Sequence, residues 1–390
     1  MAVKAVILDL DGTLLNGVKP VPETPEMISA MQASGLKIAI ASNKSDGAAR
    51  AKDSGLAHHL FLSRSSVGAS KGSPKWVEKV TETFDIESNE VVWLGDSDND
   101  MRSAVNGSVI YFHAGWSVPS YPYGIPISKP LLFPLILREC FQKSSNWYWT
   151  LSTIDPIGRD VMARAMLDGN GAGIPSLRNN LLSFLKDGGN PRVGMFSVRD
   201  LMILHLIGSI YGEGLFRTAD IWAVYPGSKG GTNKALEVFA NMASRLFKDK
   251  YLGNLLIRHT NSMDSGLTRW KGMSVTFENQ INTVNLNPEF SDRIDGKVVV
   301  LVDDFTTRGY SSECARNLLL CAGAKDVMCV SISKYGLYQS LIAPIEGYSW
   351  NPFTPTTHEN GQFVEIKVSG DSDSNGLTVV RESYQRIAKT

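Results

Sequence analysis

Two stretches of the sequence carry paired acidic residues directly after an apolar run. The first stretch, AVILDLDGTLL, contains Asp9 and Asp11, and the second, VVVLVDDFTTRGYSS, contains Asp303 and Asp304. Apolar runs of this kind are typical of buried strands, and a carboxylate at the end of such a strand is costly to desolvate unless it binds something. The sequence therefore predicts two acidic binding sites, one near each end of the chain.

Further polar side chains follow strand-like runs in the N-terminal part. Ser42 follows LKIAIA, the aspartates of GDSDND follow VVWL, and Lys71 precedes a helix expected to begin at Pro74. In parallel α/β sheets such groups meet at the carboxyl ends of the strands. Carboxylates with one lysine suit phosphoryl transfer. The acids hold Mg²⁺ and one of them attacks phosphorus, while another protonates the leaving oxygen and the lysine neutralises the phosphoryl oxygens.

These residues resemble the four motifs of the haloacid dehalogenase (HAD) superfamily of phosphatases, in order, over about the first 115 residues. The resemblance implies that Asp9 in DLDGT is the nucleophile and Asp11 the general acid and base. It also implies that Ser42 in ASN and Lys71 in KGSP bind the phosphoryl group. The resemblance implies a Mg²⁺ site formed by Asp9, Asp11, Asp96 and Asp100.

Several alternatives stay open at this point. Lys75, on the first turn of the following helix, competes with Lys71 for the third motif, although the spacing before Pro74 favours Lys71. Asp98 is expected outside the metal coordination shell. The alternative interpretation of the whole set is acidic loop residues and helix caps. No cap insertion fits between the motifs, and capless members of the superfamily often act on macromolecules or use a lid from elsewhere.

The C-terminal acids suggest a different ligand. Two adjacent carboxylates accept hydrogen bonds from a vicinal diol. The turn that follows opens a helix, whose N-terminal amides together with Thr and Ser hydroxyls form an anion site. A diol next to a phosphate describes ribose 5-phosphate. The stretch resembles the phosphoribosyl pyrophosphate (PRPP) motif of type I phosphoribosyltransferases. The resemblance implies a PRPP site formed by Asp303, Asp304, Thr306, Thr307, Arg308, Gly309, Tyr310 and Ser311.

Upstream residues extend this resemblance to the competence-protein-F-like branch, over about residues 218–335. AVYPGSKGG resembles the pyrophosphate loop of the family, and LLIRHT and SGLTRW supply two arginines. The residues so implied are Pro226, Gly227, Ser228, Lys229, Gly230, Arg258 and Arg269. The chain departs from the family at Arg308, where a hydroxyl residue is usual, and it lacks the cysteines of the zinc ribbon that usually comes first. Catalysis at this site is therefore less firmly implied than binding.

The elements that position these residues follow from hydrophobic periodicity. Strands are predicted at 3–9, 36–41, 91–95, 298–303 and 326–332, and helices near 23–34, 44–54, 74–84, 233–248 and 309–322. Strands that alternate with helices indicate a parallel sheet covered on both faces. Between the two alternating units, helices are predicted at 131–143, 155–167, 176–186 and 198–211.

The expected fold class is therefore α/β, with two Rossmann-like parallel-sheet domains, HAD and type I phosphoribosyltransferase, joined by a mainly helical segment. The expected divisions are a HAD-like phosphatase domain at 1–116, a proline-rich linker at 117–130, a helical segment and hood at 131–216, a phosphoribosyltransferase domain at 217–335 and a C-terminal extension at 336–390, which would contribute to the hood.

Composition limits the partners. Of 390 residues, 43% are hydrophobic, which is enough for a sizeable core, and 39 basic residues balance 39 acidic ones, so no nucleic-acid or membrane surface is indicated. No apolar stretch is long enough to span a bilayer. The four cysteines form no CxxC pair, which favours a reduced, cytoplasmic protein over a zinc protein. A homodimer is left open.

We therefore expect a bifunctional enzyme that uses Mg²⁺, a small phosphorylated substrate and PRPP. The second domain would make a 5′-phosphorylated N-riboside, and the first would remove its phosphate to leave a nucleoside-like product. The alternative is a HAD phosphatase regulated by a domain that senses PRPP or a nucleotide without turning it over. The acceptor base is not indicated by any motif.

Overall fold

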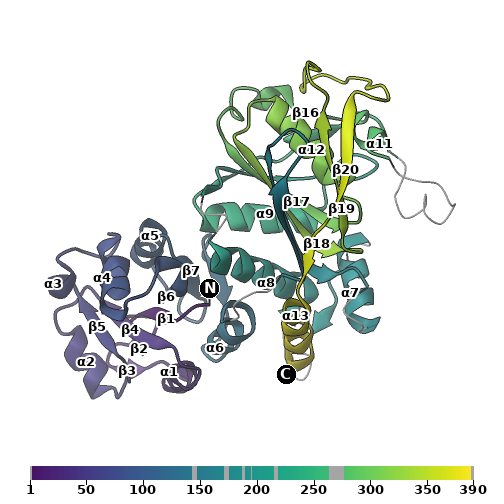
Figure 1. Cartoon of the computed structure of the whole chain (residues 1–390). Coiled ribbons are helices and arrows are strands. Elements are labelled where there is room, and N and C mark those ends of the chain that lie inside the picture. Colours follow the sequence, from purple (N-terminus) through teal and green to yellow (C-terminus); the bar gives the residue numbers. More distant parts are fainter. Residues whose placement is uncertain are drawn as a thin grey trace. The chain divides into compact units, whose positions relative to one another are not determined.

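The computed structural model describes residues 2–142, 147–170, 175–186, 189–194, 196–214, 218–262 and 276–387. The chain divides into two compact units (Figure 1). Unit 1 comprises residues 1–145, 207–217 and 245–248, and unit 2 comprises residues 146–206, 218–244 and 249–390. Arg269 lies outside the described residues.

Unit 1 contains a six-stranded, fully parallel sheet in the order β5-β4-β1-β6-β7-β8. Its strands are β1 (Ala5–Asp9), β4 (Lys37–Ser42), β5 (Leu60–Ser63), β6 (Val91–Gly95), β7 (Ile110–Ala114) and β8 (Ile125–Ile127). A small hairpin of β2 (Leu15–Asn16) and β3 (Lys19–Pro20) follows β1. The predicted parallel α/β sheet of the N-terminal part is confirmed.

Helices cover both faces of this sheet, α4 and α5 on one side and α1 and α6 on the other (Figure 1). The helices are α1 (Thr24–Ala33), α2 (Gly47–Asp53), α3 (Arg64–Val67), α4 (Lys75–Phe84), α5 (Asp98–Asn106) and α6 (Leu132–Ile136), with a short 3₁₀ turn at η1 (Ser88–Glu90) and a π-helical segment, η2 (Leu137–Phe141), that continues α6. Alternate strand residues serve the two faces, as the two-residue period requires. Ile7 and Trp93 pack with Trp76 of α4, whereas Phe112 meets Phe133 of α6 at a ring distance of 5.0 Å.

Unit 2 is built on a seven-stranded sheet in the order β14-β13-β17-β18-β10-β9-β21. Its strands are β9 (Trp149–Ile154), β10 (Asp160–Asp168), β13 (Ile221–Val224), β14 (Lys250–Tyr251), β17 (Val298–Thr306), β18 (Asp326–Lys334) and β21 (Asp371–Ser372). The five strands from β14 to β10 are parallel, and β9 and β21 are antiparallel additions at one edge. A parallel sheet in the C-terminal part is therefore also present.

The remaining elements surround this sheet. They are three small antiparallel pairs, β11 (Arg192–Val193) with β12 (Phe196–Ser197), β15 (Leu256–Arg258) with β16 (Val284–Leu286) and β19 (Tyr338–Pro344) with β20 (Phe363–Ser369), and the helices α7 (Pro175–Lys186), α8 (Val198–Glu213), α9 (Lys234–Leu246), α11 (Glu278–Ile281), η4 (Pro288–Phe290), α12 (Tyr310–Cys321) and α13 (Ser374–Ile387). Leu318 of α12 joins the core on one face of the sheet, and Phe239 of α9 meets Trp222 of β13 edge-on.

The segment at 131–216 differs from the prediction of a mainly helical region. The helix expected at 155–167 is wrong, because these residues form most of strand β10, which pairs with β18 and β9. The run MARAML favours a helix by intrinsic propensity, but its residues are largely buried between neighbouring strands, and tertiary packing overrides propensity there. The expected helices at 176–186 and 198–211 are present as α7 and α8.

The segment boundaries at 117–130 and 217–335 also differ between the prediction and the structure. The expected linker at 117–130 contains β8, an edge strand that pairs with β7. Pro126 sits within this edge strand, where the missing amide hydrogen costs least. Unit 2 includes strands from before residue 217 and after residue 335. Residues 217–335 are therefore not a separate compact unit.

Candidate active site

The carboxyl edge of the unit 1 sheet gathers the N-terminal candidate residues. Asp9 ends β1, Ser42 ends β4, and Asp96 follows β6 directly. Because β1 pairs in parallel with both β4 and β6, these three ends lie side by side, as expected for a doubly wound sheet. Asp100 is added from the first turn of α5, which begins at Asp98.

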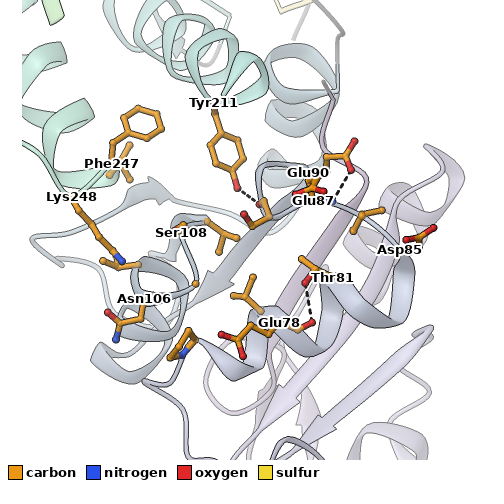
Figure 2. Close-up of a pocket in the computed structure, with 18 residues that line it drawn as sticks. Glu78, Thr81, Asp85, Glu87, Glu90, Asn106, Ser108, Tyr211, Phe247 and Lys248 are labelled. Carbon is orange, nitrogen blue, oxygen red and sulfur yellow. Dashed lines mark hydrogen bonds between the residues drawn. The ribbon is translucent and has the colours of Figure 1, made fainter. Parts of the chain in front are cut away.

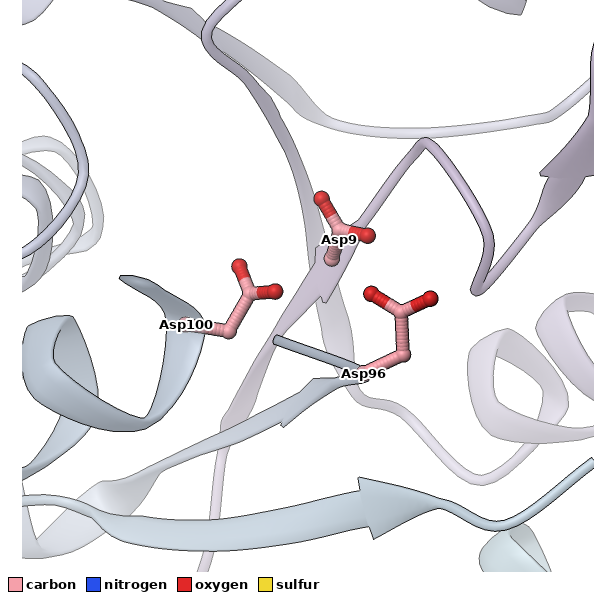
Figure 3. A group of neighbouring side chains, drawn as sticks. All are labelled: Asp9, Asp96 and Asp100. Carbon is pink, nitrogen blue, oxygen red and sulfur yellow. The ribbon is translucent and has the colours of Figure 1, made fainter. Parts of the chain in front are cut away.

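Three carboxylates form a compact group at this edge (Figure 3). Asp9, Asp96 and Asp100 each offer one oxygen, and these oxygens lie within 4.8 Å of one another. Asp9 and Asp100 are buried. Gly12 permits the close approach of Asp96, because a Cβ at position 12 would lie 2.0 Å from its Oδ2, and the backbone there has a φ of +87° that favours glycine. We call these three residues the acidic triad.

Lys71 completes the buried charge set. Its Nζ contacts Asp9 Oδ1 and lies 2.9 Å from Asp100 Oδ1. Its backbone amide donates to Asn43 Oδ1 at 3.0 Å, which fixes the loop that carries it. Lys75, the rival candidate, is exposed on α4. The structure thus brings Lys71, and not Lys75, to the acidic triad.

The electrostatics of the triad fit a hard cation. Burial raises the pKa of Asp9 to about 8, although Lys71 counteracts this and Asp100 reinforces it. Burial also raises the pKa of Asp96. The Oδ2 atom of Asp9 is buried without a hydrogen-bond partner, which is costly unless something else satisfies it. Three clustered carboxylates with one unsatisfied oxygen are the donor set that Mg²⁺ prefers, so the residues present fit this ion.

Asp11 faces a different set of partners. Arg50 Nη1 and Nη2 donate to its Oδ1 and Oδ2 at 2.8 and 3.1 Å, Lys44 Nζ donates to Oδ1 at 2.9 Å, and Ser42 Oγ donates to Oδ2 at 3.0 Å. Partial burial alone raises the pKa of Asp11, but the donors, Arg50 foremost, outweigh it and lower the pKa to about 2. The structure does not bring this carboxylate into the acidic triad, and the role of Asp11 in the metal site stays a prediction.

Arg50 and Lys44 were missed by sequence reasoning. Both residues come after the second motif, ASN, in the chain, and neither is part of it. Only their position relative to β4 could have indicated them, because the loop and helix after a parallel strand start at the functional edge of the sheet. Ser117, which donates to Asp96 Oδ2 at 2.6 Å, was missed for the same reason. Asp98 accepts from Tyr121 Oη at 2.5 Å and is not part of the triad.

Unit 1 also contains a cavity of about 620 Å³, which lies away from this edge (Figure 2). Its walls include Glu78 and Thr81 of α4, Glu87 and Glu90 before β6, and Tyr211. Apart from Tyr211, these residues precede β6 in the chain, whereas the acidic triad lies at the carboxyl ends of the strands. No residue predicted from the motifs lines this cavity.

In unit 2 the two predicted PRPP segments belong to neighbouring strands. Strands β13 and β17 are parallel neighbours. Residues 225–231 follow β13 directly, whereas residues 303–311 comprise the last part of β17, a short turn and the start of α12. Gly309 has a φ of +80° before α12, and a Cβ there would lie 2.5 Å from the side chain of Gln339. Both predicted phosphate loops therefore lie at the carboxyl ends of adjacent parallel strands.

Arg258 connects the first of these loops to the rest of the unit. Its Nε donates to the Gly227 carbonyl at 2.7 Å, and its Nη2 donates to Gln280 Oε1 at 3.0 Å. A cavity of about 270 Å³ beside this loop is lined by Pro226, Gly231, Thr232, Asn254, Leu256, Ile257, Arg258 and Asn287. Arg258 is therefore placed at the candidate pyrophosphate loop.

A buried lysine, Lys334, holds the turn after β17 in place, and sequence reasoning missed it. Lys334 Nζ donates to the carbonyl oxygens of Thr307 and Tyr338. Asp303 and Asp304 are half-buried at the end of β17, and Arg308 is exposed. Burial lowers the pKa of Lys334 to about 8. No motif marks such a lysine, because its role depends on burial between strands.

Comparisons with known proteins bear on unit 1. The family model for haloacid dehalogenase-like hydrolases matches residues 17–107, a range that includes Ser42, Lys71, Asp96 and Asp100. No curated protein matches the chain. Within the described ranges, no helix has the length and apolarity needed to cross a membrane.

Solved structures resemble about a third of the chain. A HAD-superfamily hydrolase from Geobacter sulfurreducens shares 15% identity, covers 34% of this chain and 98% of its own, and gives a TM-score of 0.31. A cobalt-bound deoxy-D-mannose-octulosonate 8-phosphate phosphatase from Haemophilus influenzae shares 16% identity, covers 30% of this chain and 71% of its own, and gives a TM-score of 0.25. These scores are low, so the assignment rests on the family match. Unit 1 contains a haloacid dehalogenase-like hydrolase domain.

Proposed function

We propose that unit 1 is a Mg²⁺-dependent phosphomonoester hydrolase. The observation that carries the proposal is the acidic triad of Asp9, Asp96 and Asp100, two of them buried, beside Lys71, with one oxygen of Asp9 unsatisfied. Mg²⁺ held by the triad would offset the charge of the phosphoryl oxygens during transfer. Lys71 keeps Asp9 oriented and favours its ionised form, which is the form that attacks.

The proposed reaction has two steps on the residues of this chain. A carboxylate oxygen of Asp9 attacks phosphorus, the bond to the leaving oxygen breaks, and Asp11 gives that oxygen a proton. Asp11 then takes a proton from a water molecule, which attacks the phosphoryl group on Asp9 and releases inorganic phosphate. Ser42 donates a hydrogen bond to a phosphoryl oxygen in both steps. Asp11 has to leave Arg50 to act in this way.

The test is hydrolysis of an aryl phosphate by wild-type protein and by Asp9→Asn. The substitution keeps the shape of the side chain and removes the nucleophile, so hydrolysis should fall to background while the circular dichroism spectrum stays unchanged. Asp98→Asn, outside the triad, serves as the matched control and should keep most activity. Substantial turnover by purified Asp9→Asn would refute the proposal.

For unit 2 we propose binding of PRPP and transfer of its ribosyl phosphate to a base-like acceptor. The observation that favours this is the adjacency of the loops after β13 and β17, with Asp303 and Asp304 at the end of β17 and Arg258 against the Gly227 carbonyl. A product of this transfer carries a 5′-phosphate, which unit 1 would remove. The second candidate is a unit that senses PRPP without consuming it, because Arg308 stands where the related loop usually has a hydroxyl.

Turnover separates these two candidates. The protein is incubated with PRPP, Mg²⁺ and a mixture of nucleobases, and products are identified by mass spectrometry. A transferase releases pyrophosphate and forms an N-riboside, whereas a sensor leaves PRPP unchanged but binds it in calorimetry. Asp303→Asn/Asp304→Asn should weaken PRPP binding, since neutral amides form weaker hydrogen bonds to the diol. Unchanged affinity in this double variant would refute the role of both acids.

A further inference from the structure

The carboxylate of Asp11 occupies a preformed anion site. Arg50 binds it with both terminal nitrogens, at 2.8 and 3.1 Å, and Lys44 adds a third charged donor at 2.9 Å. Paired contacts of a guanidinium with both oxygens are the strongest and most shape-specific way in which proteins bind a carboxylate. The site therefore matches a planar carboxylate in both charge and geometry.

The main cation of this site is held in place independently of Asp11. Arg50 lies on α2, and its side chain is only 13% exposed. Its Nε lies 3.2 Å from Asp46 Oδ2, and its Nη1 donates to the Gly17 carbonyl, at the tip of the β2–β3 hairpin, at 3.2 Å. Lys44, in the loop before α2, is 61% exposed. One largely buried and one exposed cation would thus remain at the site when Asp11 leaves it.

The reaction places this site beside the leaving group. A general acid has to come within hydrogen-bond reach of the oxygen that it protonates. Because Arg50 and Lys44 are in direct contact with Asp11, they lie within one side-chain length of the position that this carboxyl group takes when it protonates the leaving oxygen. Withdrawal of Asp11 leaves a partly buried guanidinium without this partner, which is costly unless another anion replaces it.

We propose that Arg50 and Lys44 bind a carboxylate of the leaving group, so that the natural substrates are phosphomonoesters of hydroxy acids. The carboxylate of the substrate takes the donors that Asp11 holds in its absence, and Asp11 is released to the leaving oxygen. This inference rests on the proposed phosphatase function of unit 1 and names its substrate class. It assigns Arg50 and Lys44 to specificity, and not to the chemical step.

The test uses pairs of substrates that differ only in charge. Alkyl phosphates of two to four carbons that end in a carboxylate are compared with their terminal amides, and kcat/KM is measured for each. The expected preference of the wild type for the acid is about 10- to 100-fold, the scale of a hydrogen-bonded charge pair. In Arg50→Ala the ratio of acid to amide should fall toward unity, and in Lys44→Gln, an exposed position that tolerates substitution, it should fall in part.

Lys52→Ala provides the matched control, since Lys52 is an exposed cation on the same helix and should keep the wild-type ratio. Equal kcat/KM for acid and amide in the wild type would overturn the inference, as would an unchanged ratio in both Arg50→Ala and Lys44→Gln. A greater preference for alkyl bisphosphates would replace the carboxylate by a phosphate. Hydrolysis of an aryl phosphate without any acid preference refutes this inference alone, whereas no hydrolysis of any phosphomonoester refutes the proposed function as well.

Discussion

The ammonium nitrogen of Lys71 lies 2.9 Å from Oδ1 of Asp100. Lys71 also contacts Asp9, and its side chain is only 5% exposed, so it is the cation that neutralises the buried acids. Lys71→Ala should lower kcat for an aryl phosphate by at least about 100-fold, the usual effect of removing a transition-state donor. Lys75→Ala, four residues away and exposed, should change kcat by less than about twofold. Similar losses in both variants would mean that Lys71 has no special role.

Substitution of a residue in the acidic triad should weaken Mg²⁺ binding, whereas substitution of a neighbouring aspartate outside it should not. Asp100→Asn removes one charged oxygen donor, so the Mg²⁺ concentration for half-maximal hydrolysis should rise by about tenfold or more. Asp98→Asn should leave this concentration unchanged, because Asp98 bonds to Tyr121 instead of the triad. A Mg²⁺ titration of activity compares the two. A larger shift in Asp98→Asn than in Asp100→Asn would contradict the assigned site.

Arg308 allows a test of the phosphate loop in unit 2. Its side chain is exposed and is therefore available to a ligand. If it binds the 5-phosphate, Arg308→Ala should weaken PRPP binding by about 1.5–3 kcal/mol in calorimetry, and binding should become less sensitive to salt. Arg293→Ala, an exposed arginine that lies over Phe290, is the control. Equal affinity and salt dependence in Arg308→Ala and wild type would show that Arg308 points away from the ligand.

The partly buried carboxyl group of Asp249 should make the stability of the folded protein depend on pH. Burial raises its pKa to about 7, although Trp222 donates a hydrogen bond to it at 2.7 Å. Between about pH 4 and 7 the folded protein therefore binds a proton that the unfolded chain has released, and its stability falls as the pH rises through this window. Asp249→Asn keeps the hydrogen-bond acceptor and removes this cost.

The expected gain from Asp249→Asn in the free energy of unfolding is on the order of 1–2 kcal/mol at pH 8, allowing for solvent screening, and none at pH 4. Urea denaturation at the two pH values measures it. Asp292→Asn, at an exposed carboxylate, should have little effect at either pH. A gain that is equal at pH 4 and pH 8 would contradict the electrostatic explanation.

A buried ion network ties α12 to the β9–β10 turn. Arg316 is fully buried and donates from Nη2 to Glu313 Oε2 at 2.8 Å and to Asp155 Oδ2 at 3.0 Å. Arg316→Met should reduce the free energy of unfolding by about 3–5 kcal/mol, because it leaves the buried carboxylate of Glu313 without its cation. Asp155 loses one of its two cations and keeps Arg159. Arg386→Met breaks an exposed pair with Glu382 and should cost less than about 1 kcal/mol. Comparable losses in urea denaturation would show that burial does not matter here.

The sequence predicted the acidic sites better than their surroundings. Asp9 and Asp96 could be placed because parallel strands end at a common edge, so the motif order alone brings them together. Arg50 could not be placed, because its contact with Asp11 depends on which face of α2 turns toward the β2–β3 hairpin. Lys334 could not be recognised either. A lysine that donates to backbone carbonyls has no charged partner whose spacing could reveal it.

The error at β10 has a different physical cause. Met, Ala, Arg and Leu favour helices in isolation, and the partner that makes this segment a strand, β18, lies more than 150 residues further along the chain. Local patterns cannot report a pairing of that separation. The boundary at 117–130 has another cause: β8 pairs with the nearby strand β7, and the prolines of this segment concealed the edge strand.

Strand β10 pairs with β18, and β9 pairs with residues 371–372. These pairings determine the order in which the two sheets can form during translation. Every strand of the unit 1 sheet lies between residues 5 and 127, so that sheet can form as soon as these residues have left the ribosome. The sheet of unit 2 starts at residue 149 and needs residue 334 to pair β10. Its first hairpin, which ends at residue 168, therefore waits with an unpaired apolar edge until residue 334 has been made, and growing chains in this state most need chaperones.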